Sequence, residues 1–214
     1  METLTLYHHP KSRSAGARVL LEALGVPYRV QFTDFTAGAN RTPAFLALNP
    51  LGKLPTLVHG EAVITEQVAI TIYLADRFPA AGLAPAFDHP LRGTYLRWLA
   101  FYGACFEPAV VDHAFKRAAL DPATSPYRDV DTVIETLAGQ LGRSDYLLGD
   151  TLTAADLLWG TALRWTTMFG IVPTLPVFMA YIERVAMHPA VQRAAALDAA
   201  LLDEVGQAGS GTGG

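Results

Sequence analysis

The chain has 214 residues, a formal net charge of -4 and a single cysteine, Cys105. Its hydrophobic fraction of 51% and charged fraction of 17% are typical of a compact globular protein rather than a disordered one. The charge offers no basic surface for nucleic acid, and one cysteine excludes an intrachain disulfide framework. No apolar run reaches the ~18 residues that suggest a membrane span, and no signal peptide is evident. We therefore expect a cytoplasmic protein of one large or two small domains.

Residues 1–79 alternate between strand and helix signals. A β-prone run at residues 4–7 precedes a helix in which Ala17, Leu20, Leu21 and Leu24 share one face. Further patterns predict a strand at 28–32, a helix at 42–48, strands at 54–58 and 62–64, and a helix at 67–78. The order β-α-β-α-β-β-α implies an α+β domain with a mixed sheet and helices packed against it.

Residues 80–90 are rich in proline and alanine, and we expect them to be a linker. Strand signals end there, which predicts an all-helical domain over residues 91–205. Its helices are expected at 91–119 with a bend at Pro108, and at 127–141, 154–169, 176–187 and 190–202. The run Thr153-Ala154-Ala155-Asp156 predicts a capping box. Residues 206–214 are almost all small and are expected to form a disordered tail.

The segment NPLGKLPTL at residues 49–57, followed by EQVAI at residues 66–70, resembles the soluble glutathione transferase family, in particular its bacterial members. The resemblance covers essentially the whole chain. It implies a thioredoxin-like glutathione-binding domain followed by an all-α helical bundle that forms an electrophile pocket. It also implies glutathione as co-substrate, no cofactor and no metal. The implied partners are glutathione, a small hydrophobic electrophile and a second copy of the chain in a homodimer, with neither nucleic acid nor membrane.

Conjugation requires the glutathione thiolate, because a free thiol has a pKa of ~8.5 and is a poor nucleophile. A hydroxyl held at the start of the first helix can donate a hydrogen bond to the sulfur and favour its charged form. Ser12 is the first candidate, since its loop resembles that of serine-type bacterial members. Tyr7 falls where tyrosine-type members keep their hydroxyl, and Ser14 is the nearest alternative, although a serine there also suits a helix cap. The position that holds cysteine in beta-type members is Arg13 here.

The resemblance also implies which residues bind glutathione. A cis peptide before Pro55 lets Leu54 pair its backbone with the cysteinyl part of the ligand, and Lys53 lies near a glutathione carboxylate. Glu66 pairs with the γ-glutamyl ammonium, while amides at Glu66 and Gln67 hold its carboxylate. A helix start favours anions, which suits the amides at Glu66 and Gln67, and a carboxylate binds an ammonium group, which suits the side chain of Glu66.

Aromatic residues in the second half are candidates for the electrophile pocket, although aromatic residues at helical spacing also form ordinary core. The candidates are Tyr102, Phe106 and Trp165. The leading hypothesis is an enzyme whose glutathione thiolate attacks hydrophobic electrophiles or reduces organic peroxides. The alternatives are a non-catalytic binding protein of the same fold, or a glutathione-dependent isomerase or dehalogenase.

Overall fold

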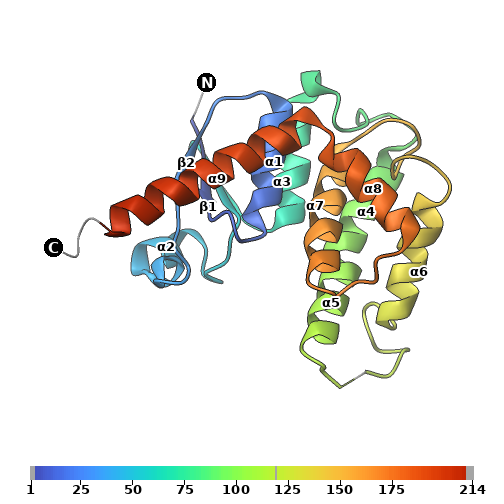
Figure 1. Ribbon diagram of the computed structural model, residues 1–214. Helices are drawn as coiled ribbons and strands as arrows, with labels where there is room; N and C mark the ends of the chain where they lie inside the picture. The colour runs from blue at the N-terminus through green and yellow to red at the C-terminus, as the bar shows by residue number, and fades with distance from the viewer. Residues whose placement is uncertain (1–2, 119, 211–214) are drawn as a thin grey trace. The chain divides into compact units, whose positions relative to one another are not determined.

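The computed structural model of the chain describes residues 3–118 and 120–210 (Figure 1). They divide into two compact units. The first contains the described residues up to Ile70 together with those from His188 onward, and the second is Thr71–Met187. Among the described helices, none combines the length and the apolar character needed to cross a lipid bilayer.

A mixed β-sheet forms the centre of the first unit. In the described part of the chain it has four strands in the order β2-β1-β3-β4. The central strand β1 pairs in parallel with β2 and antiparallel with β3, and β3 pairs antiparallel with β4. This arrangement confirms the mixed sheet that the sequence predicts. The strands are β1 (Leu4–His8), β2 (Tyr28–Phe32), β3 (Thr56–His59) and β4 (Ala62–Ile64).

Local sequence signals mark the end of α1 and the start of α2 in the first unit. Gly25 ends α1 with a φ of 64°, a left-handed conformation that glycine adopts without a steric penalty. Thr42 caps α2, because its hydroxyl accepts a hydrogen bond from the Phe45 amide at 3.3 Å. The helices are α1 (Ser14–Leu24), α2 (Pro43–Leu48), the first turn of α3 (Gln67–Arg77), which continues into the second unit, and α9 (Pro189–Ser210).

The last helix, α9, differs from the sequence-based expectation in place and in length. The sequence assigns residues 190–202 to the helical domain, yet α9 packs along α1 in the first unit (Figure 1). Two ion pairs link these helices: Asp198 with Arg18 at 2.6 Å and Glu22 with Arg193 at 3.3 Å. The helix continues to Ser210, so the prediction of a disordered tail from residue 206 is wrong for residues 206–210. Residues 211–214 lie outside the described part of the chain.

The second unit is helical throughout its regular elements. The predicted capping box is present at the start of α7, where Asp156 accepts hydrogen bonds from the Thr153 amide and hydroxyl, both at 2.8 Å. A short 3-10 turn at Pro79–Ala81 overlaps the start of the linker expected at residues 80–90. The helices are α4 (Arg92–Phe101), a π-helical turn (Tyr102–Phe106), α5 (Glu107–Ala114), α6 (Val130–Leu141), α7 (Ala154–Met168) and α8 (Pro176–Ala186).

Two helices of the second unit depart from their predicted bounds. The irregularity expected at Pro108 takes the form of a wide π-helical turn that ends just before it. Proline has no amide hydrogen and its ring collides with the preceding turn, so a regular α-helix cannot pass through this position undisturbed. The helix expected from residue 127 begins at Val130 instead, because Asp129 caps it by accepting a hydrogen bond from the Thr132 amide at 2.7 Å.

Candidate active site

The segments that carry the predicted site residues meet at one end of the sheet. Tyr7 pairs with Thr56 across β1 and β3, so Pro55 lies where β1 ends and the loop to α1 begins. Leu57 pairs with Ile64 across β3 and β4, so the residues that follow β4 reach the same end. The strand register therefore brings together the loop of Ser12, the Lys53–Pro55 segment and the start of α3.

Ser12 and Ser14 form a hydroxyl pair at the N-terminus of α1. Their Oγ atoms lie 2.7 Å apart. Ser14 is fully buried, whereas Ser12 is only partly buried and donates to the His9 carbonyl at 2.8 Å. Of the two serines, Ser12 is therefore the one that a ligand in the loop can reach, and Ser14 lies behind it.

Tyr7 faces the other side of the sheet. Successive side chains of β1 point to opposite faces of the sheet. Leu4, Leu6 and His8 are buried on the face that packs against α1, where His8 contacts Ser14. Tyr7 lies on the opposite face. Its ring packs edge-on against Phe45 of α2, with ring centroids 5.6 Å apart. There Tyr7 also lines a hollow of about 190 Å³ with residues of β2 and α2. The structure thus separates Tyr7 from the serine pair.

The Leu54–Pro55 peptide bond is cis, as the sequence predicts. Pro55 is buried, Leu54 is half-buried and Lys53 is exposed. Asn49, which is buried, holds this segment by donating to the Lys53 carbonyl at 2.9 Å and to the Thr56 hydroxyl at 3.0 Å. The asparagine of the NPLGKLP run therefore has a structural role that positions the backbone around Leu54.

Glu66 precedes α3 in an uncommon backbone conformation. Its φ is 62°, in the left-handed region that non-glycine residues seldom adopt, and its carbonyl accepts a hydrogen bond from the Ile70 amide at 2.9 Å. Such a conformation costs of order 1–3 kcal/mol and is concentrated at functional sites. Glu66 is exposed and Gln67 is half-buried. The carboxylate of Glu66 is accordingly open to a ligand.

The candidates for the electrophile pocket differ in their exposure. Tyr102 and Phe106 are buried in the second unit, where both pack against Trp159 with centroids 5.3 and 4.8 Å from its ring. Trp165 on α7 is half-buried and lies near Phe169. Burial favours the core role for Tyr102 and Phe106, and their lining of a pocket stays a prediction.

Sequence reasoning missed two residues, His8 and Asp198. His8 contacts Ser14, and Asp198 contacts His8. His8 Nδ1 lies 2.7 Å from Ser14 Oγ, and His8 Nε2 lies 2.9 Å from Asp198 Oδ1. The alternation along β1 could have shown that His8 is buried. No local signal in α9 pointed to Asp198, which is 190 positions away along the chain.

No group of three or more histidine, cysteine, aspartate or glutamate side chains with metal-binding proximity occurs among the described residues. The groups at this end of the sheet are hydroxyls, backbone amides and a carboxylate, which suit an anionic or zwitterionic small molecule.

Comparisons with known proteins agree with this geometry. Residues 2–76 match the family model described as glutathione S-transferase, N-terminal domain, and residues 108–189 match the one described as glutathione S-transferase, C-terminal domain. Glutathione S-transferase 3 of Zea mays is 30% identical over 92% of this chain and 95% of its own length.

Two solved structures of bacterial relatives have the same fold. A sphingomonad glutathione S-transferase complexed with glutathione has a TM-score of 0.75 and 30% identity, covering 91% of this chain and 98% of its own. The ternary complex of BphK, a bacterial GST, has a TM-score of 0.76 and 28% identity, covering 91% and 99%. The fold and family predicted from the sequence are confirmed: the chain belongs to the glutathione S-transferase family and is a glutathione transferase.

Proposed function

We propose that glutathione binds at the end of the sheet where β1 stops, and that Ser12 activates its thiol. The observation that carries this proposal is the half-exposed Ser12 hydroxyl at the N-terminus of α1, while Ser14 is buried and Tyr7 faces α2. A hydroxyl there and the helix N-terminus both favour a thiolate over a thiol. The activated sulfur then attacks a hydrophobic electrophile or reduces an organic peroxide.

The remaining binding roles follow from the same geometry. Leu54 offers backbone groups beside the cis peptide, the exposed Lys53 lies near a glutathione carboxylate, and Glu66 presents its carboxylate to the γ-glutamyl ammonium. The Glu66 and Gln67 amides, at the start of α3, hold the γ-glutamyl carboxylate. Sphingomonad glutathione S-transferase, which is similar in fold, was solved complexed with glutathione.

The proposal extends to the second unit and to the assembly. We infer that the helical segment supplies the electrophile pocket, with Trp165 as its most accessible aromatic candidate. A homodimer in the cytoplasm is part of the same proposal, supported by family membership and by the single cysteine.

The test of Ser12 is a pH titration of the thiolate absorbance of bound glutathione. Ser12→Ala removes a hydrogen bond to a charged group, worth ~1.5–3 kcal/mol, so the midpoint is expected to rise by about 1–2 pH units while affinity changes little. Tyr7→Phe is the matched control, because it removes a hydroxyl from the opposite face of the sheet and should leave the midpoint in place. If the midpoint rises in Tyr7→Phe alone, activation belongs to Tyr7. If it rises in neither variant, activation belongs to the backbone amides.

A further inference from the structure

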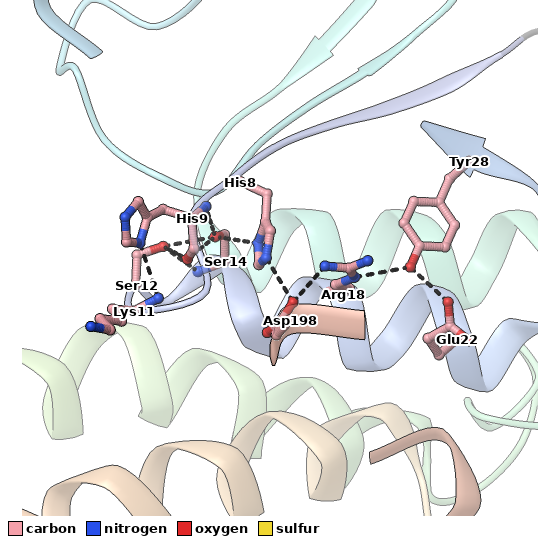
Figure 2. A network of polar contacts seen from close by, with 9 residues as sticks. All are labelled: His8, His9, Lys11, Ser12, Ser14, Arg18, Glu22, Tyr28 and Asp198. Carbon is pink, nitrogen blue, oxygen red and sulfur yellow. Dashed lines mark hydrogen bonds and ion pairs between the residues drawn. The ribbon is translucent and has the colours of Figure 1, made fainter. Parts of the chain in front are cut away.

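A line of side-chain hydrogen bonds runs from Ser12 into the interior and ends on α9. Figure 2 shows His8 of β1 between Ser14 on α1 and Asp198 on α9. The successive contacts are Ser12 Oγ to Ser14 Oγ at 2.7 Å, Ser14 Oγ to His8 Nδ1 at 2.7 Å, and His8 Nε2 to Asp198 Oδ1 at 2.9 Å. Both ring nitrogens of His8 thus bind side chains rather than backbone.

The partners of Asp198 determine which nitrogen of His8 carries the proton. Arg18 donates to the same Asp198 oxygen at 2.6 Å, so this oxygen acts as an acceptor. An ionised carboxylate only accepts hydrogen bonds, so Nε2 of His8 carries a hydrogen. In neutral His8 the other nitrogen, Nδ1, is then an acceptor that faces the Ser14 hydroxyl. A carboxylate, an imidazole and a hydroxyl in this order form the arrangement by which enzymes withdraw a proton from a hydroxyl group.

Exposure falls along this line from the site inward. Ser12 is half-buried, whereas Ser14 and His8 are both 0% exposed. Both hydroxyls also bind the loop backbone, since Ser12 Oγ accepts from the Ser14 amide at 3.2 Å and Ser14 Oγ accepts from the His9 amide at 3.1 Å. The order of the groups gives a route for a proton between the ligand and His8 that excludes bulk water.

We propose that His8 accepts the thiol proton of glutathione through Ser12 and Ser14, with Asp198 as a positioning residue. This inference rests on the proposed function of Ser12. The Ser12 hydroxyl first turns from the His9 carbonyl, to which it donates at 2.8 Å, toward Ser14 Oγ at 2.7 Å. The thiol proton then passes to Ser12 Oγ, the Ser12 proton to Ser14 Oγ and the Ser14 proton to His8 Nδ1. One S–H bond is broken, one N–H bond is formed, and both serines end with one proton each. The thiolate then accepts a hydrogen bond from Ser12, and the His8 imidazolium is paired with Asp198.

The end state depends on the groups that pair with each new charge. Transfer from a thiol of pKa ~8.5 to an imidazole of pKa ~6.5 is unfavourable by about a hundredfold between the free groups. After the transfer His8 Nε2 faces Asp198 Oδ1 at 2.9 Å, and Ser12 with the α1 N-terminus faces the thiolate. Arg18, which is paired with Asp198, and His9, the next residue of the chain, lie near His8, and the charges of Lys11 and Asp34 act on His9. Burial lowers the pKa of His9, so it is neutral beside His8 at the pH of the test below.

The test counts protons as the complete chain binds glutathione at about pH 8, where a free imidazole is neutral. Binding enthalpies in buffers of different ionisation enthalpy give the protons released, and ultraviolet absorbance gives the thiolate formed. S-methylglutathione, which has no thiol, gives the background release. The parent is expected to form thiolate with almost no proton released above that background. His8→Gln should form less thiolate and release about one proton for each thiolate that it forms.

Three further variants separate the relay from a packing role. Asp198→Asn and Ser14→Ala should both raise the number of protons released per thiolate, as His8→Gln does. Ser14→Ala retains both Ser12 and His8. These two variants provide the test if His8→Gln does not fold. Glu22→Gln is the matched control: it removes another carboxylate between α1 and α9, which bonds Tyr28 at 2.6 Å and Arg193 at 3.3 Å, and should behave like the parent.

Release of about one proton per thiolate by the parent, or an unchanged count in His8→Gln, would overturn the relay and leave Ser12 activation intact. A parent that binds glutathione without forming thiolate would overturn both proposals.

Discussion

At the scale of the residue, Glu66 combines an exposed carboxylate with a left-handed φ of 62°. We expect Glu66→Gln to weaken glutathione binding by about 10–100-fold, because the ligand ammonium loses a charged partner worth ~1.5–3 kcal/mol. Titration calorimetry measures this affinity. Glu61→Gln is the control, since Glu61 is also exposed, in the turn between β3 and β4. Equal affinities for parent and Glu66→Gln would contradict the assigned role.

At the scale of the element, the entrance of α7 depends on the buried carboxylate of Asp156. Besides Thr153, it accepts from the Leu147 amide at 2.8 Å and from the Tyr181 hydroxyl at 2.9 Å. Burial raises the pKa of Asp156, and these donors oppose the rise. Asp156→Ala leaves the donors without an acceptor, so we expect the free energy of unfolding to fall by about 3 kcal/mol or more.

Denaturant titration measures the Asp156→Ala loss. Asp150→Ala, an exposed aspartate just before the same helix, is expected to change the free energy of unfolding by no more than about 0.5 kcal/mol. A similar small change in Asp156→Ala would show that α7 does not depend on its capping box.

At the scale of the whole molecule, the proposed homodimer predicts a particle of twice the chain mass. Light scattering at micromolar concentrations should give twice 23.0 kDa, with dissociation only on strong dilution. The mean hydropathy of +0.24 shows that the chain as a whole is rich in apolar residues. A mass of 23.0 kDa across that concentration range would exclude the dimer.

Much of the fold could be predicted because its signals are local. The Thr153–Asp156 capping box depends on residues within one turn, and the structure confirms it. The end of α1 at Gly25 and the Thr42 cap of α2 depend on equally local residues. The cis bond before Pro55 was predicted through the family resemblance of residues 49–57. The end of α9 was mispredicted because its glycine-rich composition suggested a tail, whereas the helix extends to Ser210.

By itself, then, the sequence determined the family, the order of strands and helices, and the loop in which the activating hydroxyl was sought. Only the tertiary structure showed the surroundings of the three hydroxyl candidates, because strand alternation and helix packing place Tyr7 against α2, bury Ser14 and leave Ser12 half-exposed. Only it joined Asp198 to His8. A hydrogen bond between residues 190 positions apart arises from the packing of α9 on α1, and no local pattern encodes it.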